Sequence, residues 1–213
     1  MKKIFPTRKK GISFLPKKWI LAICLVSIAG NTPATQPPKS GKAYVVSNAH
    51  LDTQWLWTVR TSIIDYIPRT IYQNLALIHD YPDYIFNFEG AVKYNWMKEY
   101  YPLDYEKVKE AIKNGRWHVS GSSWDANDVN VPSPESSFRN ILLGQEFYKK
   151  EFGLKSTDIF LPDCFGFGYT LPSIAKHCGL IGFSTQKLGW RKKPFYGNSK
   201  IPVSYTHLRA HET

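Results

Sequence analysis

The chain has 213 residues, of which 43% are hydrophobic, so it is long and apolar enough to bury the core of one globular domain. Its formal net charge of +11 would suit a nucleic-acid partner, but seven of the 28 basic residues fall within residues 1–29, which contain no acidic residue. The remaining 21 basic residues exceed the 17 acidic ones by only 4, and no basic stripe accompanies them, so we expect no nucleic-acid binding.

Residues 1–29 have the pattern of a signal peptide, in which a basic region precedes an apolar run from Trp19 to Ala29. The run is shorter than the roughly 20 apolar residues that span a bilayer, so we expect no stable membrane span after cleavage. Because of this signal peptide, we expect the protein to be exported to the periplasm or the extracellular space. A lipoprotein signal ending at Cys24 is a weaker alternative, because Ile23 is bulkier than the residue expected before a lipidated cysteine.

A polar, proline-rich linker covers residues 30–42, and the folded domain is predicted to occupy residues 43–202. Within it, short β-like runs alternate with helical patterns. The predicted strands are 43–47, 84–88, 117–120, 158–161 and 182–185. The predicted helices are one with apolar residues at helical spacing from Ile64 to Ile78, a pair on either side of Pro102 that stops at Asn114-Gly115, one after Ser133, and 171–178.

The helix after Ser133 has clear end signals. Ser133 is a favourable N-cap, Pro134 suits the first helical position, and Glu135 suits the positive end of the helix dipole. Gly153 is expected to end the helix. Its predicted buried face consists of Phe138, Ile141, Leu142 and Phe147.

Alternating strands and helices predict an α/β fold with a parallel sheet and crossover helices, either an open sheet or a barrel. Polar and aromatic residues follow every predicted strand at its carboxyl end, which is the edge where such folds build their sites. These residues are His50, Asp52, Glu89, Trp124, Asp128, Asp163, Gln186 and Lys187.

His50 and Asp52 stand two residues apart, so in extended backbone both side chains leave on one face and can converge on a cation. A mixed nitrogen and oxygen ligand set suits zinc. A simple hydrogen-bonded pair is the commoner arrangement of such residues. Trp55 and Trp57 are likewise more often core residues than platforms for a sugar.

Asp163 stands among aromatic residues and glycines that allow a ring-shaped ligand to approach, although it could instead cap the following helix. Asp125 and Asp128 flank the same predicted cleft and are more often the residues of Asx turns. Cys164 and Cys178 form no metal-binding or disulfide spacing and are predicted to be small buried residues.

Two segments resemble glycoside hydrolase family 38 α-mannosidases of the bacterial type. Residues 50–57, His-Leu-Asp-Thr-Gln-Trp-Leu-Trp, are similar to the family's zinc-binding opening motif, and residues 161–166, Leu-Pro-Asp-Cys-Phe-Gly, are similar to its nucleophile segment. Further similar segments occur in the family's order at 115–117, 124–128, 134–136 and 185–187. The resemblance covers residues 43–190.

The resemblance implies a retaining, zinc-dependent α-mannosidase that releases terminal α-D-mannose from oligosaccharides or glycans. One zinc ion would be held by His50, Asp52 and Asp163, and Asp163 would also be the catalytic nucleophile. Trp55, Asp128 and Lys187 would contact the substrate. Asp125 departs from the commoner family residue. The implied fold is a seven-stranded β/α barrel of which about five strands are present, so we expect an N-terminal fragment whose general acid and fourth ligand, a histidine, come from later sequence.

Two other functions remain open. A zinc-dependent polysaccharide deacetylase would use a similar incomplete barrel, but its paired-aspartate and His-x-x-x-His segments are missing from residues 43–202. A non-catalytic carbohydrate-binding protein would be consistent with an aromatic content of 15%.

Residues 203–213 are interpreted as a non-native tail. His207 and His211 stand four apart and would face one metal in a helix. However, the segment back-translates into a DNA sequence that resembles a transposase adapter used in preparing sequencing libraries. We therefore expect native sequence to end at about Pro202.

Overall fold

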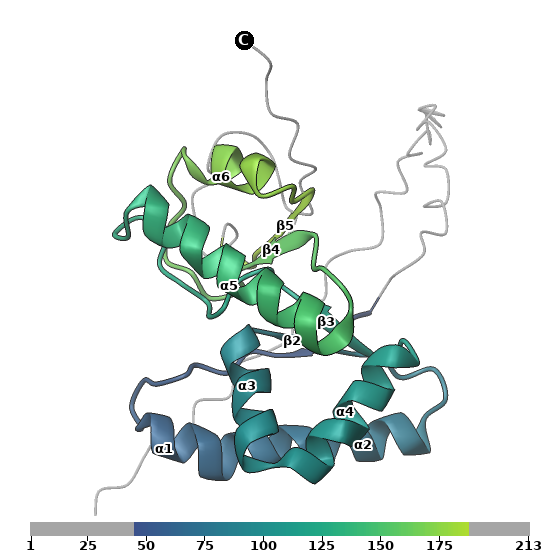
Figure 1. Ribbon diagram of the computed structural model, residues 1–213. Helices are drawn as coiled ribbons and strands as arrows, with labels where there is room; N and C mark the ends of the chain where they lie inside the picture. Colours follow the sequence, from purple (N-terminus) through teal and green to yellow (C-terminus); the bar gives the residue numbers. More distant parts are fainter. Residues whose placement is uncertain (1–44, 188–213) are drawn as a thin grey trace, which may run out of the picture. The chain divides into compact units, whose positions relative to one another are not determined.

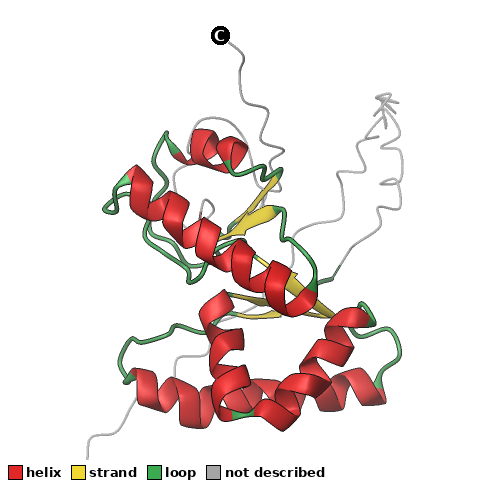
Figure 2. Cartoon of the chain, viewed as in Figure 1, coloured by secondary structure: helices red, strands yellow, loops and turns green. Residues whose placement is uncertain are grey.

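The computed structural model describes residues 45–187. Its strands are β1 (Ser47–Ala49), β2 (Phe86–Glu89), β3 (Trp117–Ser120), β4 (Asp158–Phe160) and β5 (Gly182–Ser184). Its α-helices are α1 (Val59–Thr61), α2 (Ile67–Asp80), α3 (Ala91–Tyr100), α4 (Pro102–Lys113), α5 (Pro134–Phe152) and α6 (Leu171–His177), and a π-helical turn, η1 (Ser62–Tyr66), joins α1 to α2. The predicted alternation of strands and helices is confirmed (Figures 1 and 2). The predicted signal peptide, linker and tail lie outside the described residues.

The strands form two parallel sheets, whereas the sequence predicted one. The first has the order β1-β2-β3 and the second pairs β4 with β5. Between β3 and β4 the backbone ladder is replaced by contacts of Asp158: its carboxylate accepts from the amide of Gly121 at 3.2 Å, and its carbonyl accepts from the hydroxyl of Ser122 at 2.6 Å. Gly121 has φ of 68°, so the chain turns out of the β3 direction there. Whether a barrel closes stays a prediction.

The limits of β2, β3, β4 and β5 lie within two residues of their predicted ranges, but β1 overlaps its predicted range, 43–47, only at Ser47. β3 is identical to its predicted range, but β1 starts only at Ser47, and Val45 is 91% exposed. β2 starts at Phe86 because the preceding chain is still turning, with the amide of Tyr84 donating to the carbonyl of Tyr81. The pairing register therefore sets where each strand begins.

Two helical predictions need correction. Leu142 is 56% exposed, and the buried residues of α5 are Ser137, Ile141, Gly144 and Tyr148. The helix is rotated relative to the predicted buried face because Gly144 packs directly on the backbone of residues 122–124.

Ile64 is also half exposed, since it belongs to the π-helical turn, whose longer period breaks the apolar spacing ahead of α2. The end signals of α5 are confirmed: the Ser133 side chain accepts from the amide of Ser136, and Gly153 is left-handed.

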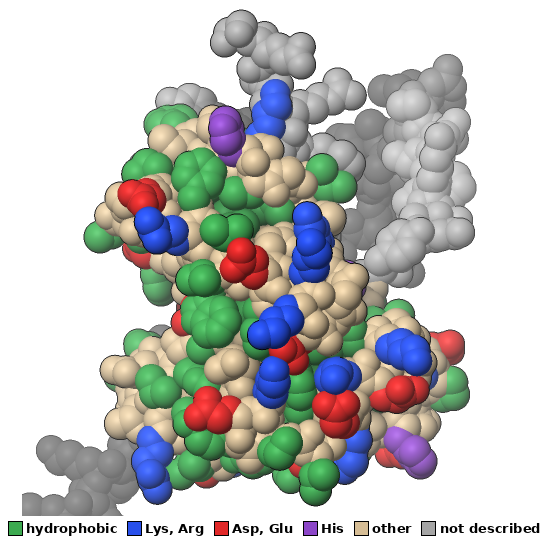
Figure 3. All heavy atoms as spheres, in the orientation of Figure 1, with side chains coloured by type: hydrophobic (Ala, Val, Ile, Leu, Met, Phe, Trp, Pro, Cys, Tyr) green, Lys and Arg blue, Asp and Glu red, His purple; other side chains and the backbone are tan. Residues whose placement is uncertain are grey.

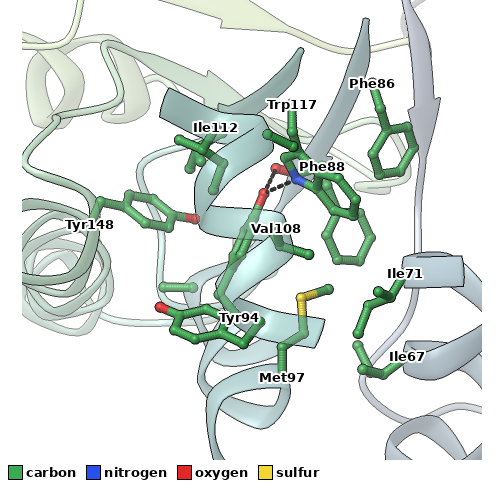
Figure 4. Packing of buried hydrophobic residues seen from close by; sticks show 14 of the residues in the cluster. Ile67, Ile71, Phe86, Phe88, Tyr94, Met97, Val108, Ile112, Trp117 and Tyr148 are labelled. Carbon is green, nitrogen blue, oxygen red and sulfur yellow. Dashed lines mark hydrogen bonds between the residues drawn. The ribbon is translucent and has the colours of Figure 1, made fainter. Parts of the chain in front are cut away.

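Helices α2, α3 and α4 gather on one side of the first sheet, and α5 contacts α3, α4 and α6 (Figure 1). Under them Phe86, Phe88 and Trp117 are buried with ring centroids 4.6–6.2 Å apart. The Tyr94 hydroxyl accepts from the Trp117 indole at 2.9 Å and donates to the Phe88 carbonyl at 3.0 Å (Figure 4). The side-chain polar atoms of Tyr94 and Trp117 are thus both paired, and this packing supports the residues of β2 and β3.

Two further observations concern the charges on the molecular surface and the length of the helices. On the face drawn in Figure 3, basic side chains are interspersed with acidic ones. The Lys98 ammonium lies 2.7 Å from Oε1 of Glu151. Across residues 45–187, no helix combines the length and apolarity needed to cross a bilayer.

Candidate active site

The predicted convergence of polar side chains at the carboxyl ends of the strands is present. His50 directly follows β1 and Glu89 is the last residue of β2. Asp163 comes three residues after β4, and Lys187 three residues after β5. Because all paired strands are parallel, these ends meet at the same edge of their sheet.

His50 lies between two carboxylates. Its Nδ1 is 2.9 Å from Oε1 of Glu89, and its Nε2 is 3.1 Å from Oδ1 of Asp52. The register explains the first contact: Ala49 pairs with Phe88, so the next residues, His50 and Glu89, stand beside each other. The second contact confirms that the two-residue spacing puts His50 and Asp52 on one face.

Asp163 completes a group of three potential metal ligands. One ligand atom each from His50, Asp52 and Asp163 lies within 4.8 Å of the others. Tetrahedral zinc with bonds of about 2.0–2.2 Å holds its ligand atoms roughly 3.3–3.6 Å apart, so small side-chain rotations would bring these atoms together. Asp163 does not cap the next helix, because α6 begins after Thr170.

The chemistry of His50 also fits a cation. When Nδ1–H donates to the Glu89 carboxylate, a neutral ring turns the lone pair of Nε2 toward the Asp52 oxygen. Two acceptors 3.1 Å apart repel each other unless a positive charge lies between them. A proton on Nε2, or a metal ion bound by both atoms, supplies that charge. The donor set of one nitrogen and two carboxylates is of the kind that binds zinc.

Buried charges around Glu89 affect its neighbours. The hydrogen bond to Glu89 is the main reason why the pKa of His50 is raised. Burial alone would raise the pKa of Glu89, but the charge of Lys93 and the hydrogen bond from His50 outweigh it and leave that pKa lowered. Burial raises the pKa of Asp125 against the opposing effect of Lys93. The glutamate therefore stays ionised beside the imidazole.

Lys187 forms an ion pair with Oδ1 of Asp163. Its ammonium also lies 4.6 Å from the centroid of the Phe165 ring, and its side chain is only 6% exposed. The lysine thereby pairs with one oxygen of Asp163.

The loop after β3 contains both aspartates that the sequence singled out. Asp128 accepts from the amides of Asn130 at 2.6 Å and Val131 at 3.1 Å, which is the predicted Asx turn. Asp125 instead turns inward and accepts from the Thr53 hydroxyl at 2.9 Å. It thus links this loop to the segment after β1.

A cavity of about 240 Å³ lies over the three potential ligands. Its lining includes His50, Asp52, Asp128, Asp163 and Phe165. Trp55 is not among the residues that line this cavity; its side chain is 66% exposed and its ring meets that of Trp57 edge-on, and a contact with substrate stays a prediction. Cys164 is buried, with its thiol near the carbonyl of Gly166, whereas Cys178 is only partly buried.

Lys93 was missed by the sequence reasoning, although a signal was present. It stands four residues after Glu89, which is one helical turn across the junction between β2 and α3, and its ammonium lies 3.1 Å from Oε1 of Glu89. Asn140 was also missed. Its amide holds the backbone of Asp125 from α5, with contacts of 2.9 and 3.1 Å.

Residues 40–203 match the glycosyl hydrolases family 38 N-terminal domain. The chain belongs to this family. It is 38% identical to alpha-mannosidase G of Dictyostelium discoideum over 149 residues, covering 70% of this chain and 14% of that protein. It is 35% identical to human alpha-mannosidase 2C1 over 147 residues, covering 69% of this chain and 14% of that protein. The family 38 resemblance seen in the motifs is confirmed.

A solved family relative has the same fold over the shared region. The alpha-mannosidase from Enterococcus faecalis V583 matches with a TM-score of 0.59 and 24% identity, covering 66% of this chain and 16% of that one. The mixed helix and parallel-sheet fold of residues 45–187 is therefore that of the corresponding part of this mannosidase. The present chain spans about 14% of the length of the curated relatives that it matches.

Proposed function

We propose that the full-length protein is a retaining, zinc-dependent α-mannosidase that removes terminal α-D-mannose from the non-reducing ends of oligosaccharides or glycans. The observation that carries this proposal is the meeting of ligand atoms from His50, Asp52 and Asp163 within 4.8 Å, beneath a cavity at the carboxyl ends of the strands. Its support is the family, whose matched relatives are named alpha-mannosidases.

Asp163 is the proposed nucleophile. One of its oxygens attacks the anomeric carbon while the glycosidic C–O bond breaks, and a general acid from another part of the full-length protein protonates the leaving oxygen. Water then hydrolyses the ester between the sugar and Asp163, which returns the carboxylate. Lys187 pairs with Oδ1 of Asp163, so Oδ2 is the proposed attacking oxygen.

His50, Asp52 and Asp163 are the proposed zinc ligands, with one ion per catalytic domain. Zinc bound there would hold sugar hydroxyl groups and stabilise the charge and ring distortion of the transition state. Asp128 and Phe165 line the same cavity, and we expect them to contact the sugar. Export of the protein is a further proposal, which rests on residues 1–29 alone.

The two alternative functions would require different properties of these residues. A deacetylase would activate a water molecule and form no sugar ester, and the family match gives it no support. A protein that only binds carbohydrate would keep its affinity for mannosides after Asp163 is replaced.

Removing the metal is expected to lower hydrolysis of an aryl α-mannoside by the full-length protein by at least about 100-fold, because a metal contributes several kcal/mol to the transition state. The measurement compares turnover before chelation, after chelation and desalting, and after adding zinc or magnesium back. Zinc is expected to restore activity, and magnesium is expected to restore none, because it prefers an all-oxygen octahedral site. Full turnover in a preparation whose metal content is verified as zero would rule out the proposed function.

A further inference from the structure

A buried ion pair lies directly behind His50. Glu89 is 2% exposed and Lys93 is fully buried, with 3.1 Å between the Lys93 ammonium and Oε1 of Glu89. The same oxygen lies 2.9 Å from Nδ1 of His50. Buried ion pairs contribute little net stability, because desolvating both charges cancels most of their attraction. Stability alone therefore does not explain why this ion pair is buried here.

The backbone places Glu89 beside His50 and outside the lining of the cavity. The register of β1 and β2 sets the two residues side by side, and Gly90, with φ of 89°, turns the chain from β2 into α3. A side chain at position 90 would place its Cβ 3.0 Å from the Lys93 ammonium, so the glycine leaves room for the lysine to fold back. Glu89 does not line the cavity over the potential ligands.

Asp125 extends the cluster toward the loop after β3. Its Oδ1 lies 3.9 Å from the Lys93 ammonium, and its Oδ2 accepts from the Thr53 hydroxyl, one residue after Asp52. Lys93 thus bridges two carboxylates that come from different strand ends. The Lys93 ammonium contacts the same Glu89 oxygen that faces the His50 ring, and so favours the position of that oxygen beside Nδ1.

We propose that Glu89 is a positioning residue: by accepting the Nδ1–H of His50 it fixes the imidazole tautomer and ring plane that direct Nε2 to the metal, while Lys93 holds Glu89 in place. This inference rests on the proposed function, because it assigns a task within the zinc site. A carboxylate behind a ligating histidine raises the basicity of the histidine and sets its orientation. In the neutral ring it leaves the lone pair on the nitrogen that faces Asp52.

The test replaces Glu89 by glutamine in the full-length protein and measures the zinc dissociation constant by competition with a chromophoric chelator. A glutamine can present either an acceptor oxygen or a donor amide to Nδ1, so the tautomer of His50 is no longer fixed. We expect zinc affinity to fall about 10–100-fold. The visible absorption of the cobalt-substituted protein should shift as well, since it reports ligand geometry.

Glu151→Gln is the matched control. Glu151 also pairs with a lysine, Lys98 at 2.7 Å, and accepts from Tyr105 at 3.1 Å, but it contacts no histidine. The same charge is removed there, and we expect less than a threefold change in zinc affinity. Glu89→Asp keeps the charge beside Lys93 and withdraws the carboxylate by one methylene, so it should weaken zinc binding even if the glutamine variant does not fold.

A double variant separates positioning from general structure. If Glu89 acts through His50, adding Glu89→Gln to His50→Ala should cause no further loss of zinc affinity. Zinc binding in the folded Glu89 variants that equals that of Glu151→Gln would overturn the inference and leave the proposed function intact. An unsubstituted full-length protein that binds no zinc would instead refute the proposed function and, with it, this inference.

Discussion

Replacing Asp163 by alanine in the full-length protein is expected to lower turnover of an aryl α-mannoside by about 10⁴-fold or more, the scale seen when a covalent nucleophile is removed. The effect is large because one substitution deletes the attacking carboxylate and one of the three atoms that converge within 4.8 Å. It also leaves Lys187, whose side chain is almost fully buried, without its carboxylate. Steady-state hydrolysis and zinc content are the measurements.

Asp163→Asn distinguishes the two roles of this residue. The amide keeps an oxygen that can face a metal but has no nucleophilic charge, so we expect more zinc to be retained than in the alanine variant, with turnover still lost. A slow fluorinated mannosyl donor should label Asp163 in the unsubstituted protein, as peptide mass spectrometry would detect. Labelling of another carboxylate would reassign the nucleophile, and retained mannoside binding without any turnover in the unsubstituted protein would favour the non-catalytic function.

Two controls accompany these variants. Asp83 is exposed in the turn before β2, at the opposite end of that strand from Glu89, so Asp83→Ala should leave turnover unchanged. Asp128→Ala should keep the fold and the metal, because Asp128 lines the cavity but bonds only its own loop.

The position of the site could be predicted because residues in the adjoining turns show where each strand ends. β3 lies between Gly115 and Gly121, both with positive φ, and its predicted limits were exact. Within each sheet the strands are parallel, so the residues that follow them share one edge, which the sequence pattern alone could predict. His50 and Asp163, 113 positions apart, follow strands of different sheets, and their closeness also depends on the contacts of Asp158 with Gly121 and Ser122.

Other features depend on contacts that sequence periodicity does not report. Leu142 fits the apolar spacing of α5, yet the helix buries Gly144 because residues 122–124 approach its backbone. The break between the two sheets depends on Asp158, whose carboxylate replaces a strand contact at Gly121. Lys93 is a charged residue that is buried only because Glu89 and Asp125 surround it, which no hydrophobic pattern predicts.

Gly144→Ala is expected to destabilise the domain by about 1–2 kcal/mol, although alanine by itself favours a helix by about 1 kcal/mol. A Cβ at this position would stand 2.3 Å from the Ser122 carbonyl oxygen and 2.7 Å from the Trp124 amide nitrogen. These are backbone atoms that cannot rotate away, so α5 and the loop after β3 must separate. Hydrogen exchange of α5 peptides in the full-length protein should accelerate about 5–30-fold.

The same displacement should reach the active site, because α5 positions the loop after β3 through Asn140, one turn before Gly144. The Asn140 carbonyl accepts from the amide of Trp124 at 2.8 Å, and its side chain bonds the backbone of Asp125. Turnover should therefore fall in Gly144→Ala although position 144 does not line the cavity. Glu146→Ala, on the exposed face of α5, is the control and should change stability by no more than about 0.5 kcal/mol. Exchange rates in Gly144→Ala equal to those of this control would show that the helix and the loop can part without cost, and that α5 does not hold the site.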